Sequence, residues 1–249
     1  MKNRLFNLFQ GNAKRGSFRA EGNTIWLYDM IVGSKAEAEW YGGVDPQSFS
    51  EALAAIKGDV HLRINSPGGD VFGGRAIAQA MSEHKGNIVA HVDGYAASAA
   101  SIIAVTAGKV IMAPGSFMMI HNSWTFAVGN ADDLAKTAAL LAKIDGTIAE
   151  TYAARGAKTA DEFSDLMSEE TWFTPQEAVD AGLADEVAPE AVGNAKNAAW
   201  NLSAYERAPA APEPVEDEAT ADPVEEPPLA SAGDDIERRV RMHAVRMLS

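Results

Sequence analysis

A serine at the start of a predicted helix is the residue in this chain best suited to act as a nucleophile. The stretch DGYAASAAS, residues 93–101, contains Ser98 and Ser101 among alanines, directly after a strand-like run. A side chain at a helix N-terminus lies beside unpaired backbone N–H groups and the positive end of the helix dipole, which favour negative charge. On this segment alone, however, a helix cap explains Ser98 and helix packing explains Ser101 more simply.

Two other segments supply the groups that a nucleophilic serine needs. The turn INSPGGDVFGG, residues 64–74, follows a predicted strand, and its glycines allow backbone N–H groups to face an anion. His121 ends a short apolar strand in MMIHNSW. Taken singly, the turn is explained by chain reversal and His121 by a structural role. Together with Ser98 they could carry acyl transfer, with His121 as general base and the N–H groups stabilising an oxyanion.

Alternating strand and helix signals must position these groups. Strand patterns are expected at residues 24–32, 59–65, 87–94, 109–113 and 116–121. Helical patterns are expected at residues 45–56, 73–84, from 98 onward, 130–156, 160–168 and 175–181, the first with Asp45 as its cap and Pro46 at its first position. Strands separated by helices predict an α/β domain with repeated crossovers.

Composition excludes several classes of function. The chain has 249 residues, a net charge of −14 and no cysteine, so disulfides and thiol catalysis are excluded and nucleic-acid binding is disfavoured. No His-Glu-x-x-His or other metal-binding spacing is present. The apolar runs are too short for a signal peptide or a membrane span, which predicts a soluble protein without a secretion signal.

Composition also divides the chain. Residues 1–23 are locally basic, and residues 24–190 carry the strand and helix patterns. Residues 191–233 are expected to form a disordered linker, because the part from 208 to 228 holds seven acidic residues, many prolines and no lysine or arginine. The helical spacing of apolar residues in 234–249 predicts a short amphipathic helix that needs a partner surface.

Four motifs together resemble the ClpP-type serine peptidases. They are INSPGGDVFGG, DGYAASAAS, APGSFMMIHNSW and TWFTPQEAVDAGLADEV, and they follow one another in the order and spacing typical of that family. The resemblance covers roughly residues 24–188. The ETWFT segment, the SPGGDVF variant and the acidic tail are most similar to the ClpP-related head maturation (prohead) proteases of tailed bacteriophages. The implied fold class is α/β, a ClpP/crotonase-like fold of repeated β-β-α units, with a disordered acidic C-terminal extension.

The resemblance implies a role for each site residue and implies no cofactor and no metal. Ser98 corresponds to the nucleophile and His121 to the general base, and the N–H groups of Gly69 and Ala99 correspond to the oxyanion hole. Glu170 stands where the family has an aspartate that orients the histidine. Glu169 and Asp165 are the alternative candidates for this third position.

The implied function is that of a serine endopeptidase that cleaves capsid, portal or scaffold proteins during phage head assembly. The expected partners are copies of the same chain in a ring, or two stacked rings, and the expected location is the bacterial cytoplasm within an assembling procapsid, with no nucleic-acid or membrane partner. The helix at residues 131–155 resembles the family's handle that pairs rings. Three alternatives stay open: a proteolytic subunit that works with an ATPase unfoldase, a crotonase-type acyl-CoA enzyme, and a non-catalytic structural ring subunit.

Overall fold

One mixed sheet with helices packed across it forms the body of the protein. The computed structural model describes residues 4–189 and 200–209. The strands follow the order β1-β2-β3-β4-β5-β8, and β6 pairs with β4 and carries β7. Their bounds are β1 Ser17–Glu21, β2 Thr24–Tyr28, β3 Val60–Ser66, β4 Ile88–Ala97, β5 Lys109–Met112, β6 Phe117–Ile120, β7 Thr171–Phe173 and β8 Glu186–Val187. All neighbours pair in parallel except β1 with β2 and β6 with β7.

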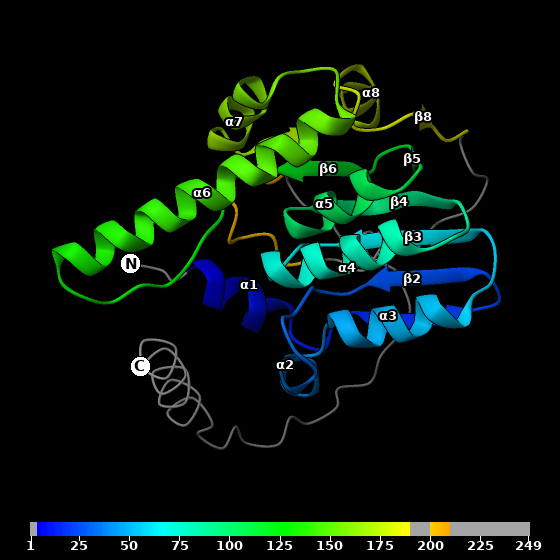
Figure 1. The fold of residues 1–249 in the computed structure, drawn as a ribbon, viewed down its shortest axis with the longest axis horizontal. Helices are drawn as coiled ribbons and strands as arrows, with labels where there is room; N and C mark the ends of the chain where they lie inside the picture. The colour runs from blue at the N-terminus through cyan, green and yellow to red at the C-terminus, as the bar shows by residue number, and fades with distance from the viewer. Residues whose placement is uncertain (1–3, 190–199, 210–249) are drawn as a thin grey trace, which may run out of the picture.

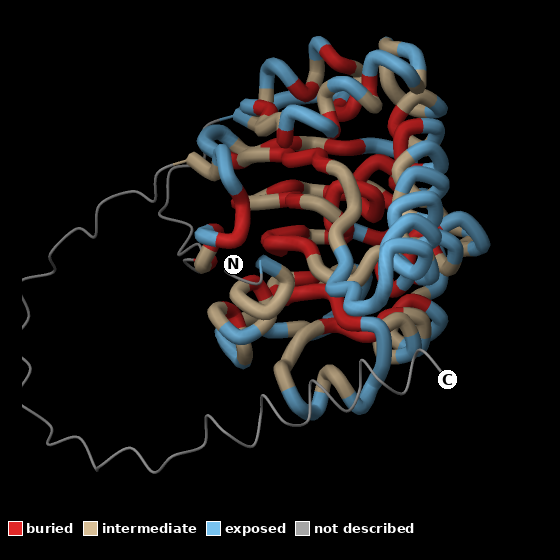
Figure 2. The backbone as a smooth tube through the Cα atoms, turned by 90° about the vertical axis from the view of Figure 1, so that its left-hand side faces the viewer, coloured by how far each residue is buried: buried red, intermediate tan, exposed pale blue. Residues whose placement is uncertain are grey.

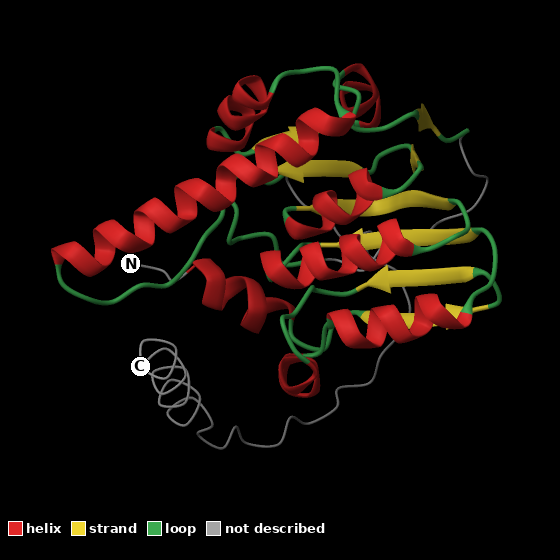
Figure 3. Cartoon of the chain, in the orientation of Figure 1, coloured by secondary structure: helices red, strands yellow, loops and turns green. Residues whose placement is uncertain are grey.

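Helices pack around this sheet, and three of them, α3, α4 and α5, cover one of its faces (Figure 1). Their bounds are α1 Arg4–Asn12, α2 Lys35–Tyr41, α3 Pro46–Ala55, α4 Val71–Glu83, α5 Ala99–Thr106, α6 Ala131–Arg155, α7 Ala160–Ser168 and α8 Pro175–Asp180. Figures 1 and 3 show α3, α4 and α5 lying across the strands on one side. Side chains such as Leu62, Ile77 and Ile103 fill the layer between them and are almost completely buried. The expected α/β class is therefore confirmed.

Local signals place the helix starts. Asp45 accepts hydrogen bonds from the N–H groups of Gln47 and Ser48, and Pro46 begins α3, as the sequence predicts. Asp70 caps α4 in the same way through the N–H of Gly73, 2.6 Å away. This cap joins α4 to the glycine turn that follows β3. The backbone of the turn is thereby fixed at the C-terminal edge of the sheet.

The N-terminal residues differ from the expectation that residues 1–23 form a separate segment. β1 pairs antiparallel with β2, from Ser17 opposite Tyr28 to Glu21 opposite Thr24, so a boundary at residue 24 would cut a hairpin. The turn between the strands contains Gly22 at a φ of 59°, a left-handed conformation that glycine adopts without strain. The hairpin adds an edge strand to the sheet. Residues 17–23 are therefore part of the folded domain.

A second difference concerns residues 200–209, which the sequence places inside the linker 191–233. Trp200, Leu202, Ala204 and Tyr205 are buried there with exposures of 3–9%, in a cluster that also contains Leu8 of α1. The linker assignment does not hold for this stretch, because its aromatic and aliphatic side chains bury apolar surface against the domain. The rest of the linker and the predicted helix 234–249 lie outside the described residues.

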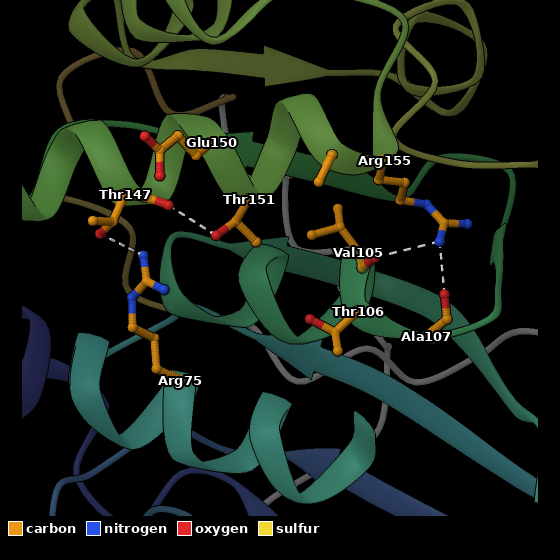
Figure 4. A pocket seen from close by; sticks show the side chains of 9 residues that line it. Arg75, Val105, Thr106, Ala107, Thr147, Glu150, Thr151 and Arg155 are labelled. Carbon is orange, nitrogen blue, oxygen red and sulfur yellow. Dashed lines mark hydrogen bonds between the residues drawn. The ribbon is translucent and has the colours of Figure 1, made fainter. Parts of the chain in front are cut away.

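The long helix α6 is anchored at its C-terminal half. Tyr152 is fully buried and bonds Ser101, and Arg155 donates to the carbonyl oxygens of Val105 and Ala107 at the end of α5. Figure 4 shows this region as a pocket bounded by α4, α5 and α6. The other half of α6 projects beyond the sheet, and Figure 2 shows it almost entirely exposed.

Candidate active site

Ser98 occupies a strained junction between β4 and α5. Its backbone has φ 52° and ψ −122°, a conformation that residues other than glycine rarely adopt. Its N–H donates to Met119 O on the neighbouring strand β6 at 2.9 Å, which fixes the junction. The Ser98 hydroxyl makes no capping hydrogen bond to α5. The helix-cap explanation therefore does not account for this residue, and its hydroxyl is free for another partner.

That partner is His121. The Ser98 Oγ lies 2.8 Å from His121 Nε2. Strands β4 and β6 run in parallel with Ala97 opposite Met119, so the residues that follow them emerge at the same edge of the sheet. The expectation that Ser98 and His121 lie together is met by this geometry. It follows from strand pairing rather than from closeness in the sequence.

The imidazole of His121 is held in its neutral form. The side chain is 9% exposed, and this burial lowers its pKa to about 3, with a smaller contribution from the positive charge of Arg4. A neutral imidazole can accept the hydroxyl proton of Ser98 through Nε2. At neutral pH the pair therefore has the protonation state that general-base catalysis requires.

The glycine turn lies directly against Ser98. A Cβ on Gly68 would come within 2.7 Å of the Ser98 Cβ, and one on Gly69 within 1.9 Å of Ile31 O, so both positions demand glycine. Ile31 pairs with the residues on either side of Gly69, donating to Gly68 O and accepting from Asp70 N. The N–H of Gly69 therefore faces away from Ile31. Ala99 begins α5 and its N–H has no acceptor within the helix.

Glu170 does not contact His121 by a hydrogen bond anywhere in the described residues. Its side chain is 8% exposed. Its Oε1 accepts from the backbone N–H of Arg207 at 2.6 Å and from Trp172 Nε1 at 3.3 Å, and its Oε2 accepts from the N–H of Glu206 at 2.9 Å. The carboxylate that the sequence nominates for orienting the histidine is thus engaged by the backbone of the 200–209 segment.

The two rival carboxylates are exposed. Asp165 faces solvent on α7, and Glu169 lies 3.9 Å from Arg207 at the surface. Neither forms a hydrogen bond with His121 within the part of the chain that the structure describes. The imidazole is instead flanked by two aromatic rings, with ring centroids 4.5 Å away for Trp124 and 5.4 Å away for Tyr205.

Tyr205 is the site residue that the sequence reasoning missed. Its hydroxyl donates to Pro67 O at 2.5 Å, directly before the two glycines of the turn. Trp200 Nε1 donates to Asn65 Oδ1 at 3.0 Å on the same side of the site. The available signal was the pair of aromatic residues in AWNLSAYERA, because linkers rarely carry large aromatic side chains.

Neither a metal site nor a membrane span is found in the described ranges 4–189 and 200–209. No group of three or more histidine, aspartate or glutamate side chains is arranged there to hold a metal ion. No helix there is long and apolar enough to cross a bilayer.

Comparison with known proteins gives one consistent family. The sequence profile of Clp proteases matches residues 48–191. The chain is 31% identical over 170 residues to the ATP-dependent Clp protease proteolytic subunit 1 of Leifsonia xyli, covering 68% of this chain and 84% of that protein. It is 34% identical over 170 residues to the proteolytic subunit 2 of Corynebacterium glutamicum, covering 68% and 85%. Proteolytic subunit 3 of Streptomyces avermitilis is 33% identical over 137 residues, covering 54% and 63%.

Proposed function

Because the chain belongs to the Clp protease family, we propose that it is a serine peptidase with Ser98 as nucleophile and His121 as general base. The observation that carries this proposal is the 2.8 Å contact between Ser98 Oγ and His121 Nε2 at a strained strand–helix junction. Strain at such a junction is typical of functional sites, because it presents a side chain that a relaxed backbone would turn elsewhere. An acyl-CoA enzyme of the crotonase type would not require this pair.

The proposed reaction proceeds through an acyl-enzyme. His121 Nε2 takes the hydroxyl proton as Ser98 Oγ bonds to the peptide carbonyl carbon, and the N–H groups of Gly69 and Ala99 stabilise the resulting oxyanion. The imidazolium then gives its proton to the leaving amine as the C–N bond breaks. Water attacks the ester in the same way, with His121 again as base, and releases the new carboxyl end and free Ser98.

Both carboxylate oxygens of Glu170 accept backbone N–H groups, those of Glu206 and Arg207, so an orienting role toward His121 would need a further contact beside these. A Glu170→Gln variant separates two roles. If the carboxylate orients His121 in the working enzyme, reactivity of Ser98 falls. If it only anchors the 200–209 segment, reactivity of Ser98 does not fall.

The test of the proposed function is labelling of the purified chain with a fluorophosphonate probe, followed by mapping of the modified residue. We expect modification at Ser98, none in Ser98→Ala, and a large loss in His121→Ala. Ser82→Ala is the control, because Ser82 is exposed on α4 and its hydroxyl donates to Gln79 O, away from Ser98 and His121. Modification at another residue, or equal labelling of the His121 variant, would contradict the assignment.

We also propose that the chain acts as the proteolytic subunit of a ring assembled from its own copies. The similar proteins named above are ATP-dependent proteolytic subunits, which supports a role with an ATPase partner. Head maturation is the second candidate, and it rests on the resemblance of the ETWFT segment and the SPGGDVF variant to the head maturation proteases. Cleavage of folded capsid, portal or scaffold protein without any ATPase would support maturation; cleavage only of unfolded chains would support the ATPase-dependent role.

A further inference from the structure

The site is covered by a segment of the chain itself. Residues 200–207, here named the cover segment, pack with α1 over the edge of the sheet where Ser98 and His121 lie. The segment and α1 both fall outside residues 48–191, the part that matches the family profile, as do strands β1 and β2.

Tyr205 is the part of the cover segment that enters the site. Its side chain is 5% exposed, and its ring lies 5.1 Å from Trp124, 5.7 Å from Trp172 and 5.4 Å from His121 between ring centroids. Its hydroxyl bonds Pro67 O and also lies within hydrogen-bonding reach of Ser98. A substrate residue next to the scissile bond would need this same space.

The backbone of the cover segment is fastened at two points. Near its end, the N–H groups of Glu206 and Arg207 donate to the buried carboxylate of Glu170. Near its start, Asn201 exchanges two hydrogen bonds with the side chain of Asn12 on α1, at 2.7 and 3.0 Å. Hydrogen bonds to a buried charged group are among the stronger ones in proteins.

An ion pair at the surface also joins the cover segment to α1. Arg4 forms an ion pair with Glu206 and places its guanidinium 5.8 Å from the Trp124 ring centroid. The cover segment is thus held by α1, by the Glu170 carboxylate and by the rings that surround Tyr205, which are those of His121, Trp124 and Trp172. The contacts with α1 join residues 189 and 202 positions apart in the chain, and those with Glu170 join residues 36 and 37 positions apart.

The cover segment does not lie as a substrate would. Its chain turns back on itself, with the N–H of Tyr205 bonded to Leu202 O at 2.9 Å, instead of running extended beside the glycine turn. A side chain, not a peptide carbonyl, approaches Ser98, and within the described residues no carbonyl of the segment accepts from the N–H of Gly69 or Ala99. The segment therefore fills the site without presenting a bond for cleavage.

We propose that the cover segment, residues 200–207, is an intramolecular mask that must leave the site before a peptide substrate can reach Ser98. The inference rests on the proposed serine peptidase activity. When the segment leaves, the space between Trp124, Trp172 and His121 is vacated for a substrate side chain, and both oxygens of Glu170 lose their backbone partners. Activity then depends on whatever shifts the masked and open populations, because only the open fraction can react.

A reversible disulfide tests this directly. A Cβ built on Gly11 of α1 lies 3.5 Å from the Asn201 Cβ, within the range that a disulfide requires. The chain has no cysteine of its own, so Gly11→Cys combined with Asn201→Cys gives a single defined cross-link. We expect Ser98 to be labelled by the fluorophosphonate probe at least about tenfold more slowly in the oxidised than in the reduced double variant. The single variants are the controls, and equal rates in the two states would overturn the mask.

Point variants in the full chain give an independent readout. We expect Tyr205→Ala to label faster than wild type, Tyr205→Phe to lie between them, and Ser203→Ala, on the exposed side of the same segment, to match wild type. Slower labelling of a folded Tyr205→Ala protein would mean that Tyr205 positions His121, and would overturn the mask.

Hydrogen exchange separates failure of the mask from failure of the enzyme. The amides of Glu206 and Arg207 should be protected in wild type and lose protection in Tyr205→Ala. If these amides exchange as fast as in an unfolded chain, the mask is wrong whatever the labelling shows. If they are protected and no variant is labelled, the docking stands and the proposed nucleophile is wrong.

Discussion

At the scale of single residues, the backbone of Ser98 is the feature with the clearest energetic consequence. A non-glycine residue at φ 52° and ψ −122° costs about 1–3 kcal/mol, and glycine at the same position removes most of that cost. We therefore expect Ser98→Gly to unfold with a free energy about 1 kcal/mol higher than Ser98→Ala, in urea titrations at pH 7. Ala104→Gly in the middle of α5 is the control and should destabilise. A Ser98→Gly protein less stable than Ser98→Ala would contradict the strain.

His121 should make folding stability depend on pH. Its pKa is about 3 in the folded chain and about 6.5 when unfolded, so between these values the unfolded state binds the extra proton. The stability that neutral His121 contributes is complete above pH 6.5 and is lost as the pH falls toward 3. Relative to His121→Gln, wild type should lose about 2 kcal/mol of unfolding free energy between pH 7 and pH 5. Parallel pH profiles for the two proteins would show that His121 is not buried as a neutral group.

At the scale of elements, the sequence predicts best where a local signal is sufficient. Helix α3 begins at Pro46 behind its Asp45 cap as expected, and the parallel strands β3 and β4 are recognisable from their apolar runs. Helix α1 was not expected, because nine residues containing Gly11 are a poor helix without partners. Its burial of Leu8 against residues 200–205 supplies the missing stabilisation, and that contact has no local signal.

The two aspartate caps allow an element-level prediction with its own control. Asp45→Ala and Asp70→Ala should each lower the unfolding free energy by about 1 kcal/mol, since each removes the acceptor for free N–H groups at a helix start. Only Asp70→Ala should also slow labelling of Ser98, because Asp70 joins α4 to the turn that carries Gly69. Asp70→Asn should restore both properties. Equal labelling rates in the two alanine variants would show that the Asp70 cap does not influence the reactivity of Ser98 through the glycine turn.

At the scale of the whole molecule, the site is assembled from ends of elements that are far apart in the sequence. The carboxyl ends of β3, β4 and β6 meet at one edge of the sheet, which is where open α/β sheets place their ligands. Motif order was enough to nominate Ser98, His121 and the glycine turn. It was not enough to find the partners of Glu170, because these come from residues 206 and 207 and depend on the completed fold. Residue patterns in the sequence therefore do not predict the contacts between the 200–209 segment and the site.

The exposed half of α6 bears on the proposed ring. Leu134 and Leu140 are 45% and 57% exposed, although both are large apolar side chains. A helix that carries such residues beyond the body of the domain is expected to bury them against another copy. Leu140→Glu should therefore shift sedimentation velocity profiles toward smaller species while leaving the circular dichroism unchanged. Ala54→Glu on the exposed side of α3 is the matched control, and it should assemble as wild type does. If Leu140→Glu assembles normally, α6 is not the surface that joins the copies, and they contact one another through another part of the chain.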